Sequence, residues 1–125
     1  MPFSITDLEI YRQAEHIADE IWEIVSQWEY FPKHTVGRQL VEAADSIPAN
    51  VSEGFGRYYF KENIRFCYYA RGSLTETSNW LRRARNRALS DEKTIQAIEE
   101  ELDVLGRMLN AYIKSLKKIE EKKIE

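Results

Sequence analysis

The chain has 125 residues, of which 43% are hydrophobic and 31% charged, with a formal net charge of −3 and a pI near 5.5. This length supports one ordinary hydrophobic core and is too short for two, so we expect a single domain over residues 1–125. Cys67 is the only cysteine, which excludes an internal disulfide framework. No stretch approaches the roughly 20 apolar residues that span a bilayer, and no secretion signal opens the chain. We therefore expect a soluble, cytoplasmic protein with no membrane partner.

The first predicted helix begins near Thr6, a candidate N-cap with Glu9 three residues later as its capping-box partner. Steps of three and four residues then separate the apolar positions, which is typical of one buried helix face. These positions are Ile10, Ala14, Ile17, Ile21, Ile24 and Trp28. Pro32 interrupts the pattern within EYFPKHT, because the residue before a proline is disfavoured in a helix. We predict a loop there.

Three further apolar stripes follow at helical spacing. The second contains Val36, Leu40, Ala43 or Ala44, Ile47 and Val51. The third contains Phe60, Ile64, Cys67, Ala70, Leu74, Thr77, Leu81 and Ala84. The fourth contains Ile95, Ile98, Leu102, Leu105, Leu109, Tyr112, Leu116 and Ile119, after a turn in which Ser90 is the expected N-cap.

Four amphipathic helices joined by short polar connections bury their stripes most simply against one another. The predicted fold is therefore all-α, an antiparallel up-and-down four-helix bundle in a single domain. Its core is expected over residues 6–119, and the charged C-terminal tail is expected to fray.

The segment SIPANVSEGFGR, residues 46–57, departs from a simple helical repeat. Pro48 removes a backbone donor and crowds the carbonyl of Ala44, which predicts a bend. Gly54 and Gly56 are predicted to close the helix in a left-handed conformation. The segment lacks the spacing and the Lys-Ser/Thr ending of a phosphate-binding loop, so capping is the favoured interpretation.

Asn50 and Glu53 lie beside Val51 on a helix that otherwise faces the core. A buried carboxylate needs a cation to offset its lost hydration, and Arg71 and Arg57 are the candidate partners. Arg71 is predicted to be close to the core. Gly72 and Ser73, which follow it, are small enough to let another helix approach. A structural ion pair that sets helix register is favoured over a chemical role.

Two linked motifs carry a family resemblance. One is Ser46, Ile47, Asn50, Glu53, Gly54, Gly56 and Arg57, with Pro48 inside it and Val51 in place of an isoleucine, and the other is Ala70, Gly72, Ser73 and Leu74. Over roughly residues 8–118 the chain resembles the S23-like four-helix bundle proteins encoded in intervening sequences of bacterial large-subunit ribosomal RNA genes.

The resemblance implies an up-and-down four-helix bundle, often assembled as a ring-shaped homopentamer, with no established enzymatic activity and no cofactor. A distant relative with a similar fold is the accessory protein of diversity-generating retroelements, a basic pentamer that binds nucleic acid and a reverse transcriptase. The acidic pI of this chain argues against general nucleic-acid binding, which depends mainly on neutralising phosphates.

Positive charge is nevertheless concentrated in one segment. Residues 56–90 have a net charge of +6, whereas residues 1–55 have −7 and residues 91–125 have −2. This basic segment suits phosphate binding, with tyrosines as stacking surfaces. It equally suits pairing with the acidic first helix, within one bundle or across a subunit boundary, and pairing is the favoured interpretation. The candidate contact residues are Lys61, Arg65, Arg82, Arg83, Arg85, Arg87, Tyr58 and Tyr59.

A metal-dependent helical-bundle enzyme is the alternative from another class. Ferritin-like sites need inward glutamates and Glu-x-x-His spacing, but His16 directly follows Glu15, and His34 is the only other histidine. We therefore interpret EHIADE as a solvated helix face and predict no metal ligands, no catalytic residues and no enzymatic activity. Cys67 and Ser73 have no histidine near them in the sequence to activate them.

Large aromatic side chains exceed what one small core can bury, and surplus aromatics are typical of subunit interfaces. They include Trp22, Trp28, Tyr30, Phe31, Phe55, Tyr58, Tyr59, Tyr68, Tyr69 and Trp80. We therefore expect a homo-oligomer, a pentamer by resemblance, acting as an assembly or adaptor module with RNA or a protein as a further candidate partner.

Overall fold

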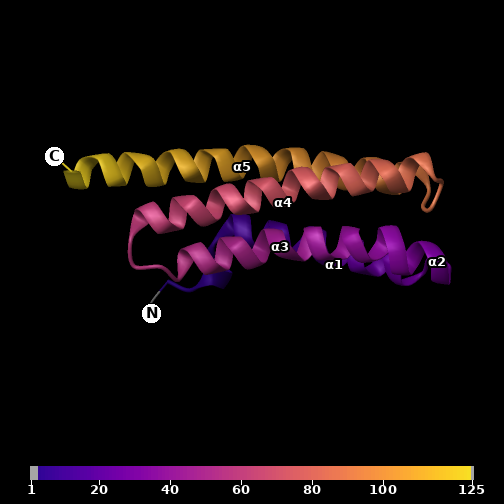
Figure 1. Ribbon diagram of the computed structural model, residues 1–125. Coiled ribbons are helices and arrows are strands. Elements are labelled where there is room, and N and C mark those ends of the chain that lie inside the picture. Colours follow the sequence, from indigo (N-terminus) through magenta and orange to yellow (C-terminus); the bar gives the residue numbers. More distant parts are fainter. Residues whose placement is uncertain (1–2, 125) are drawn as a thin grey trace.

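The computed structural model describes residues 3–124, and the regular secondary structure of this part of the chain is entirely helical (Figure 1). A short 3-10 turn, η1 (Ile5–Asp7), precedes helix α1 (Glu9–Ser26). One turn of helix, α2 (Tyr30–Pro32), and a π-helical stretch, η2 (Lys33–Gly37), lead into α3 (Arg38–Phe55). Helices α4 (Phe60–Asn86) and α5 (Glu92–Ile124) follow.

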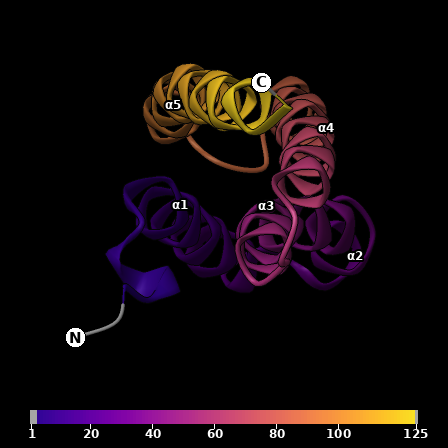
Figure 2. The same ribbon diagram turned by 90° about the vertical axis from the view of Figure 1, so that its left-hand side faces the viewer.

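The four long helices form the predicted antiparallel bundle. Successive long helices run in opposite directions in Figure 1, and Figure 2 shows α1, α3, α4 and α5 in turn around the bundle axis. Helices α1 and α4 each pack against α3 and α5. They therefore lie at opposite corners of the bundle, which decides which charged faces can meet within one chain.

The core is made from the predicted apolar stripes, which confirms the helical periodicity. Ile17, Leu40, Leu81 and Leu105 are among its fully buried side chains. Along α5 the stripe follows Ile113 in place of the half-buried Tyr112, and it ends at Leu116, since Ile119 is exposed. The segment expected to fray is helical as far as Ile124.

The N-terminal cap differs from the prediction. The backbone N–H of Ser4 donates to Asp7 Oδ2 at 2.8 Å, so the capping contact belongs to η1 and not to Thr6 and Glu9. Leu8 has an extended backbone conformation, which separates η1 from α1, and α1 begins at Glu9. The sequence contains two overlapping capping signals, and the earlier one forms.

The predicted loop around Pro32 is also wrong. Pro32 is the third residue of α2, where a backbone N–H would lack an intrahelical acceptor, so proline is tolerated at this position. The helical path then continues through η2 into α3. Gln27–Glu29 is the short break between α1 and the next helical segment.

The turn between α4 and α5 is capped by Asp91 and not by the predicted Ser90. Asp91 Oδ1 accepts the backbone N–H of Thr94 at 2.8 Å, and Oδ2 accepts the Thr94 hydroxyl at 2.7 Å. These bonds lower the pKa of Asp91. Ser90 instead accepts a hydrogen bond from Trp28 Nε1 at 2.8 Å, which connects the break after α1 to this turn.

None of the helices within residues 3–124 combines the length and the apolar character that crossing a membrane requires.

Candidate subunit and nucleic-acid interface

The glycines of the SIPANVSEGFGR segment do not close α3 in a left-handed conformation. Within the described residues no glycine has a positive φ, and Gly56, the C-cap of α3, has a φ of −78°. Gly54 lies inside α3, where α4 crosses closely. A Cβ placed on it would lie 2.6 Å from Asn63 Oδ1 and 3.0 Å from both the Asn63 carbonyl oxygen and the Phe66 Cβ. Glycine is therefore required here by close helix packing.

Pro48 is buried inside α3, and the helix continues past it to Phe55. Nearby polar side chains bond to the backbone of their own helix. Asn50 Nδ2 donates to the Ser46 carbonyl at 2.8 Å, and the Ser46 hydroxyl donates to the Glu42 carbonyl at 2.8 Å. Asn50 and Ser46 therefore satisfy local backbone acceptors of α3.

Glu53 is not buried, which corrects the predicted internal ion pair. Its side chain is 54% exposed and accepts a hydrogen bond from Arg57 Nη2 at 2.6 Å, one helical turn away. The Arg57 guanidinium also lies 4.9 Å from the centre of the Phe66 ring. The rotation of α3 explains the difference, because Gly54 and Val51 face inward and place Glu53 at the solvent edge.

Replacing Glu53 with alanine is expected to change the free energy of unfolding by about 0.5 kcal/mol or less, because exposed ion pairs contribute little. Chemical denaturation of Glu53→Ala beside Glu42→Ala, which removes the similarly exposed pair with Arg38 on the same helix, measures this. A loss near 3 kcal/mol for Glu53→Ala alone would instead indicate a desolvated pair.

Arg71 is exposed, so the predicted position near the core is wrong, and its partner is on α5. Its Nη1 donates to Asn110 Oδ1 at 3.1 Å, and its guanidinium lies 4.7 Å from the centre of the Tyr68 ring. Arg71 therefore joins α4 to α5 at the surface.

Gly72 and Ser73 do not receive another helix of the same chain. Among residues 3–124, no atom would lie within 4 Å of a Cβ placed on Gly72, and Gly72 is exposed. Ser73 is half-buried, and its carbonyl accepts the Thr77 hydroxyl at 2.8 Å. The close approach that small residues permit is therefore still available on this face of α4.

The basic residues of α4, together with Arg87 at its C-cap, divide into those that form an ion pair and those that do not. Arg85 bonds Glu99 of α5, and Arg65 lies 4.0 Å from Glu62 on its own helix. Arg82, Arg83, Arg87 and Lys61 are exposed and make no ion pair within the described residues. The predicted pairing of this helix with α1 does not form inside one bundle, because the two helices lie at opposite corners.

Exposed aromatic side chains gather at the two ends of the bundle. Tyr58 and Tyr59 stack edge to face at the α3–α4 turn and are 85% and 62% exposed. Tyr30 and Phe31 are exposed at the opposite end. Trp22 is also exposed and lines a largely apolar hollow of about 480 Å³ with residues that include Val25, His34, Gly37 and Val41.

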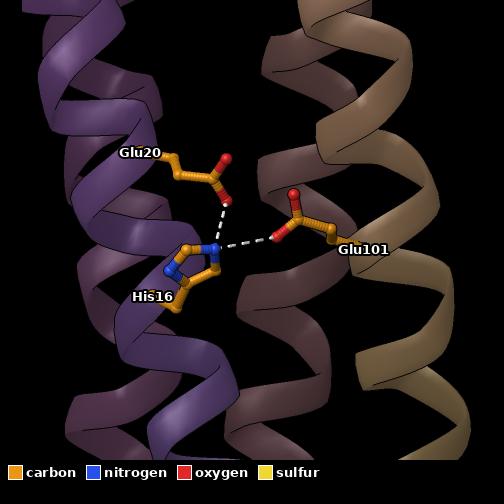
Figure 3. Close-up of side chains that lie close together, drawn as sticks. All are labelled: His16, Glu20 and Glu101. Carbon is orange, nitrogen blue, oxygen red and sulfur yellow. Dashed lines mark ion pairs between the residues drawn. The ribbon is translucent and has the colours of Figure 1, made fainter.

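One cluster was not predicted. His16 and Glu20 of α1 meet Glu101 of α5 across the seam between these helices (Figure 3). His16 Nε2 lies 3.1 Å from Glu20 Oε1 and 3.6 Å from Glu101 Oε2. Burial raises the pKa of Glu101 to about 7, with the neighbouring Glu20 as the second cause. The spacing of His16 and Glu20 is visible in the sequence, but Glu101 joins them only through helix packing.

The interpretation of EHIADE as a solvated face is therefore only partly correct. Glu15 and Asp19 are exposed, whereas Glu20 is half-buried and points toward α5 (Figure 3). Cys67 is fully buried in the core as predicted, and burial raises the pKa of its thiol to about 11, which keeps it protonated at neutral pH.

Comparison with known proteins agrees with this architecture. A solved structure of a protein of unknown function from the S23 ribosomal protein family of Bacteroides thetaiotaomicron superimposes with a TM-score of 0.76. That protein is 18% identical in sequence, and the match covers 84% of this chain and 98% of the other. Curated proteins give no match. The model of the family described as 23S rRNA-intervening sequence protein matches residues 6–111. The chain therefore belongs to the 23S rRNA-intervening sequence protein family.

Proposed function

We propose that this protein is a non-enzymatic subunit of a homo-oligomeric ring, a pentamer by family resemblance, and that it acts as an assembly or adaptor module. The observation that carries this proposal is the open face of α4 at Gly72. A glycine in the middle of a long helix costs about 1 kcal/mol relative to alanine, and none of the residues that the structure describes requires a glycine at position 72. Close packing of a helix of another subunit against this face would explain why position 72 is a glycine.

Charge supports the same contact. The exposed Arg82, Arg83 and Arg87 of the basic segment form no ion pair with an acidic residue in the described part of the chain, and the exposed Asp19 and Glu23 of α1 lie at the opposite corner of the bundle. A head-to-tail contact, in which α4 of one subunit meets α1 of the next, pairs these faces, and such contacts form a ring when the rotation between successive subunits closes. The exposed Tyr69, one helical turn from Gly72 on α4, adds apolar area.

The variant Gly72→Gln tests the interface. We expect sedimentation velocity at micromolar concentration to show an oligomer for the wild-type protein and a folded monomer for Gly72→Gln, because the added side chain blocks the close approach. Ala111→Gln, a similar enlargement at an exposed position of α5, is the matched control and should keep the oligomer. Circular dichroism confirms that both variants fold. A monomeric wild-type protein, or an oligomer that survives Gly72→Gln, would contradict the proposal.

RNA binding is the second candidate function, favoured by the unpaired Arg82, Arg83 and Arg87. The structure separates these arginines from Tyr58 and Tyr59 by nearly the whole of α4, roughly 35 Å at 1.5 Å per residue. Arg82, Arg83 and Arg87 therefore do not share one surface with Tyr58 and Tyr59 within a single chain. Sub-micromolar RNA affinity at ~150 mM salt, lost in Arg82→Gln/Arg83→Gln, would favour RNA over subunit pairing.

A further inference from the structure

We infer that His16, Glu20 and Glu101 form a binding site for a divalent transition-metal ion, Zn²⁺ by the chemistry of the ligands, which fastens α1 to α5. The three proposed ligands belong to one chain and lie on the seam between α1 and α5. The ring contact is assigned to the α4 face around Gly72 and to Asp19 and Glu23 of α1, which also line the hollow beside this cluster. The role assigned to the metal is structural and does not involve catalysis. The metal would hold together α1 and α5, two helices that are far apart in the sequence.

The spacing of the three side chains fits a single ion. Zn²⁺ binds histidine nitrogen and carboxylate oxygen at about 2.0–2.2 Å, so two ligands of a tetrahedral site lie roughly 3.4 Å apart. His16 Nε2 is 3.1 Å from Glu20 Oε1 and 3.6 Å from Glu101 Oε2, and all three ligand atoms lie within 4.8 Å of one another. Small side-chain rotations are sufficient to place them around one ion.

The hydrogen bonding at the cluster points independently to a cation. Glu20 Oε1 and Glu101 Oε2 are excluded from solvent, and neither accepts a hydrogen bond from any of the described residues. No lysine or arginine among the described residues forms an ion pair with either carboxylate. A neutral imidazole offers at most one proton at Nε2, so it cannot serve both oxygens. A divalent ion satisfies both carboxylates and the imidazole at once.

The kind of metal follows from the ligands and the surroundings. One imidazole with two carboxylates suits Zn²⁺ and neighbouring first-row metals, whereas Mg²⁺ and Ca²⁺ prefer oxygen ligands alone. A hollow that includes Glu20, Asp19, Glu23 and Thr94 in its lining opens beside His16. This hollow gives the ion a path from solvent and leaves room for a water molecule as the fourth ligand.

Zinc titration of the purified, chelator-treated full chain tests the site. Isothermal titration calorimetry with ZnCl₂ is expected to show one ion per chain, and thermal unfolding is expected to move to higher temperature as ZnCl₂ is added, because the ion binds only the folded arrangement. Glu101→Gln is nearly isosteric and should weaken the affinity roughly ten-fold or more. His16→Ala should do the same.

Matched controls separate this site from adventitious binding. Glu100→Gln changes the neighbouring exposed residue on α5, and His34→Ala removes the other histidine, so both should bind Zn²⁺ like the wild-type protein. MgCl₂ should produce no comparable thermal shift. Wild-type affinity in Glu101→Gln or His16→Ala, equal shifts with Mg²⁺, or no thermal shift with Zn²⁺ would overturn the inference. Sedimentation velocity of Glu101→Gln should still show the ring, which keeps this test separate from that of the oligomer.

Discussion

Replacing Gly54 with alanine is expected to lower the free energy of unfolding by about 2 kcal/mol. The new Cβ would lie 2.6 Å from Asn63 Oδ1 and 3.0 Å from the Asn63 carbonyl oxygen, and this backbone atom cannot move without separating α3 from α4. Overpacking typically costs about 1–3 kcal/mol, and a clash with a backbone atom lies at the upper end of this range. A net loss of about 2 kcal/mol therefore remains after the gain of about 1 kcal/mol in helix propensity. Urea denaturation of the purified variant measures the difference.

Gly106→Ala is the matched control for this change. Gly106 also lies inside a long helix, but a Cβ there would lie 3.9 Å from Leu74 Cδ1, an ordinary van der Waals contact. The same substitution should therefore raise the free energy of unfolding by up to about 1 kcal/mol through helix propensity alone. If both variants were stabilised, the close crossing of α3 and α4 at Gly54 would be wrong.

The metal-free protein is expected to lose about 1–2 kcal/mol of stability as the pH rises from about 4.5 to about 7. The pKa of Glu101 is raised from its usual 4.5 to about 7 by burial and by Glu20. In this window the folded chain holds a proton that the unfolded chain has released, so each step to higher pH favours unfolding. One pKa unit corresponds to about 1.4 kcal/mol, and partial solvent exposure of Glu101 reduces the full effect.

The pH effect is isolated by comparing variants in the presence of a chelator. Glu101→Gln removes the titrating group, so the wild-type protein should become less stable relative to this variant as the pH rises through the window. Glu100→Gln, an exposed neighbour, should follow the wild-type curve. Parallel curves for the wild-type protein and Glu101→Gln between pH 4.5 and 7 would show that Glu101 is not held in a desolvated cluster.

The sequence predicted the helices better than it predicted their ends. Periodicity of the apolar residues located α1, α3, α4 and α5, because the spacing of a buried face is a local property of one helix. The caps at Thr6 and Ser90 were predicted wrongly, since Ser4 with Asp7 and Asp91 with Thr94 offer competing local hydrogen bonds. Pro32 was assigned to a loop because its tolerated place in the first turn of a helix depends on where that helix begins.

Fold class and the burial of Cys67 follow from the amino-acid sequence alone, because four regular apolar stripes can be buried in few ways. The roles of Gly54, Glu53 and Glu101 depend instead on how the helices pack. Successive residues of a helix point about 100° apart, so Gly54 faces the core while its neighbour Glu53 is exposed. The sequence around them does not show which helix packs against this face. Gly54 is required by Asn63 on α4, and Glu101 meets His16 although 84 residues lie between them. Such contacts join distant parts of the chain, so only the packed bundle brings them together.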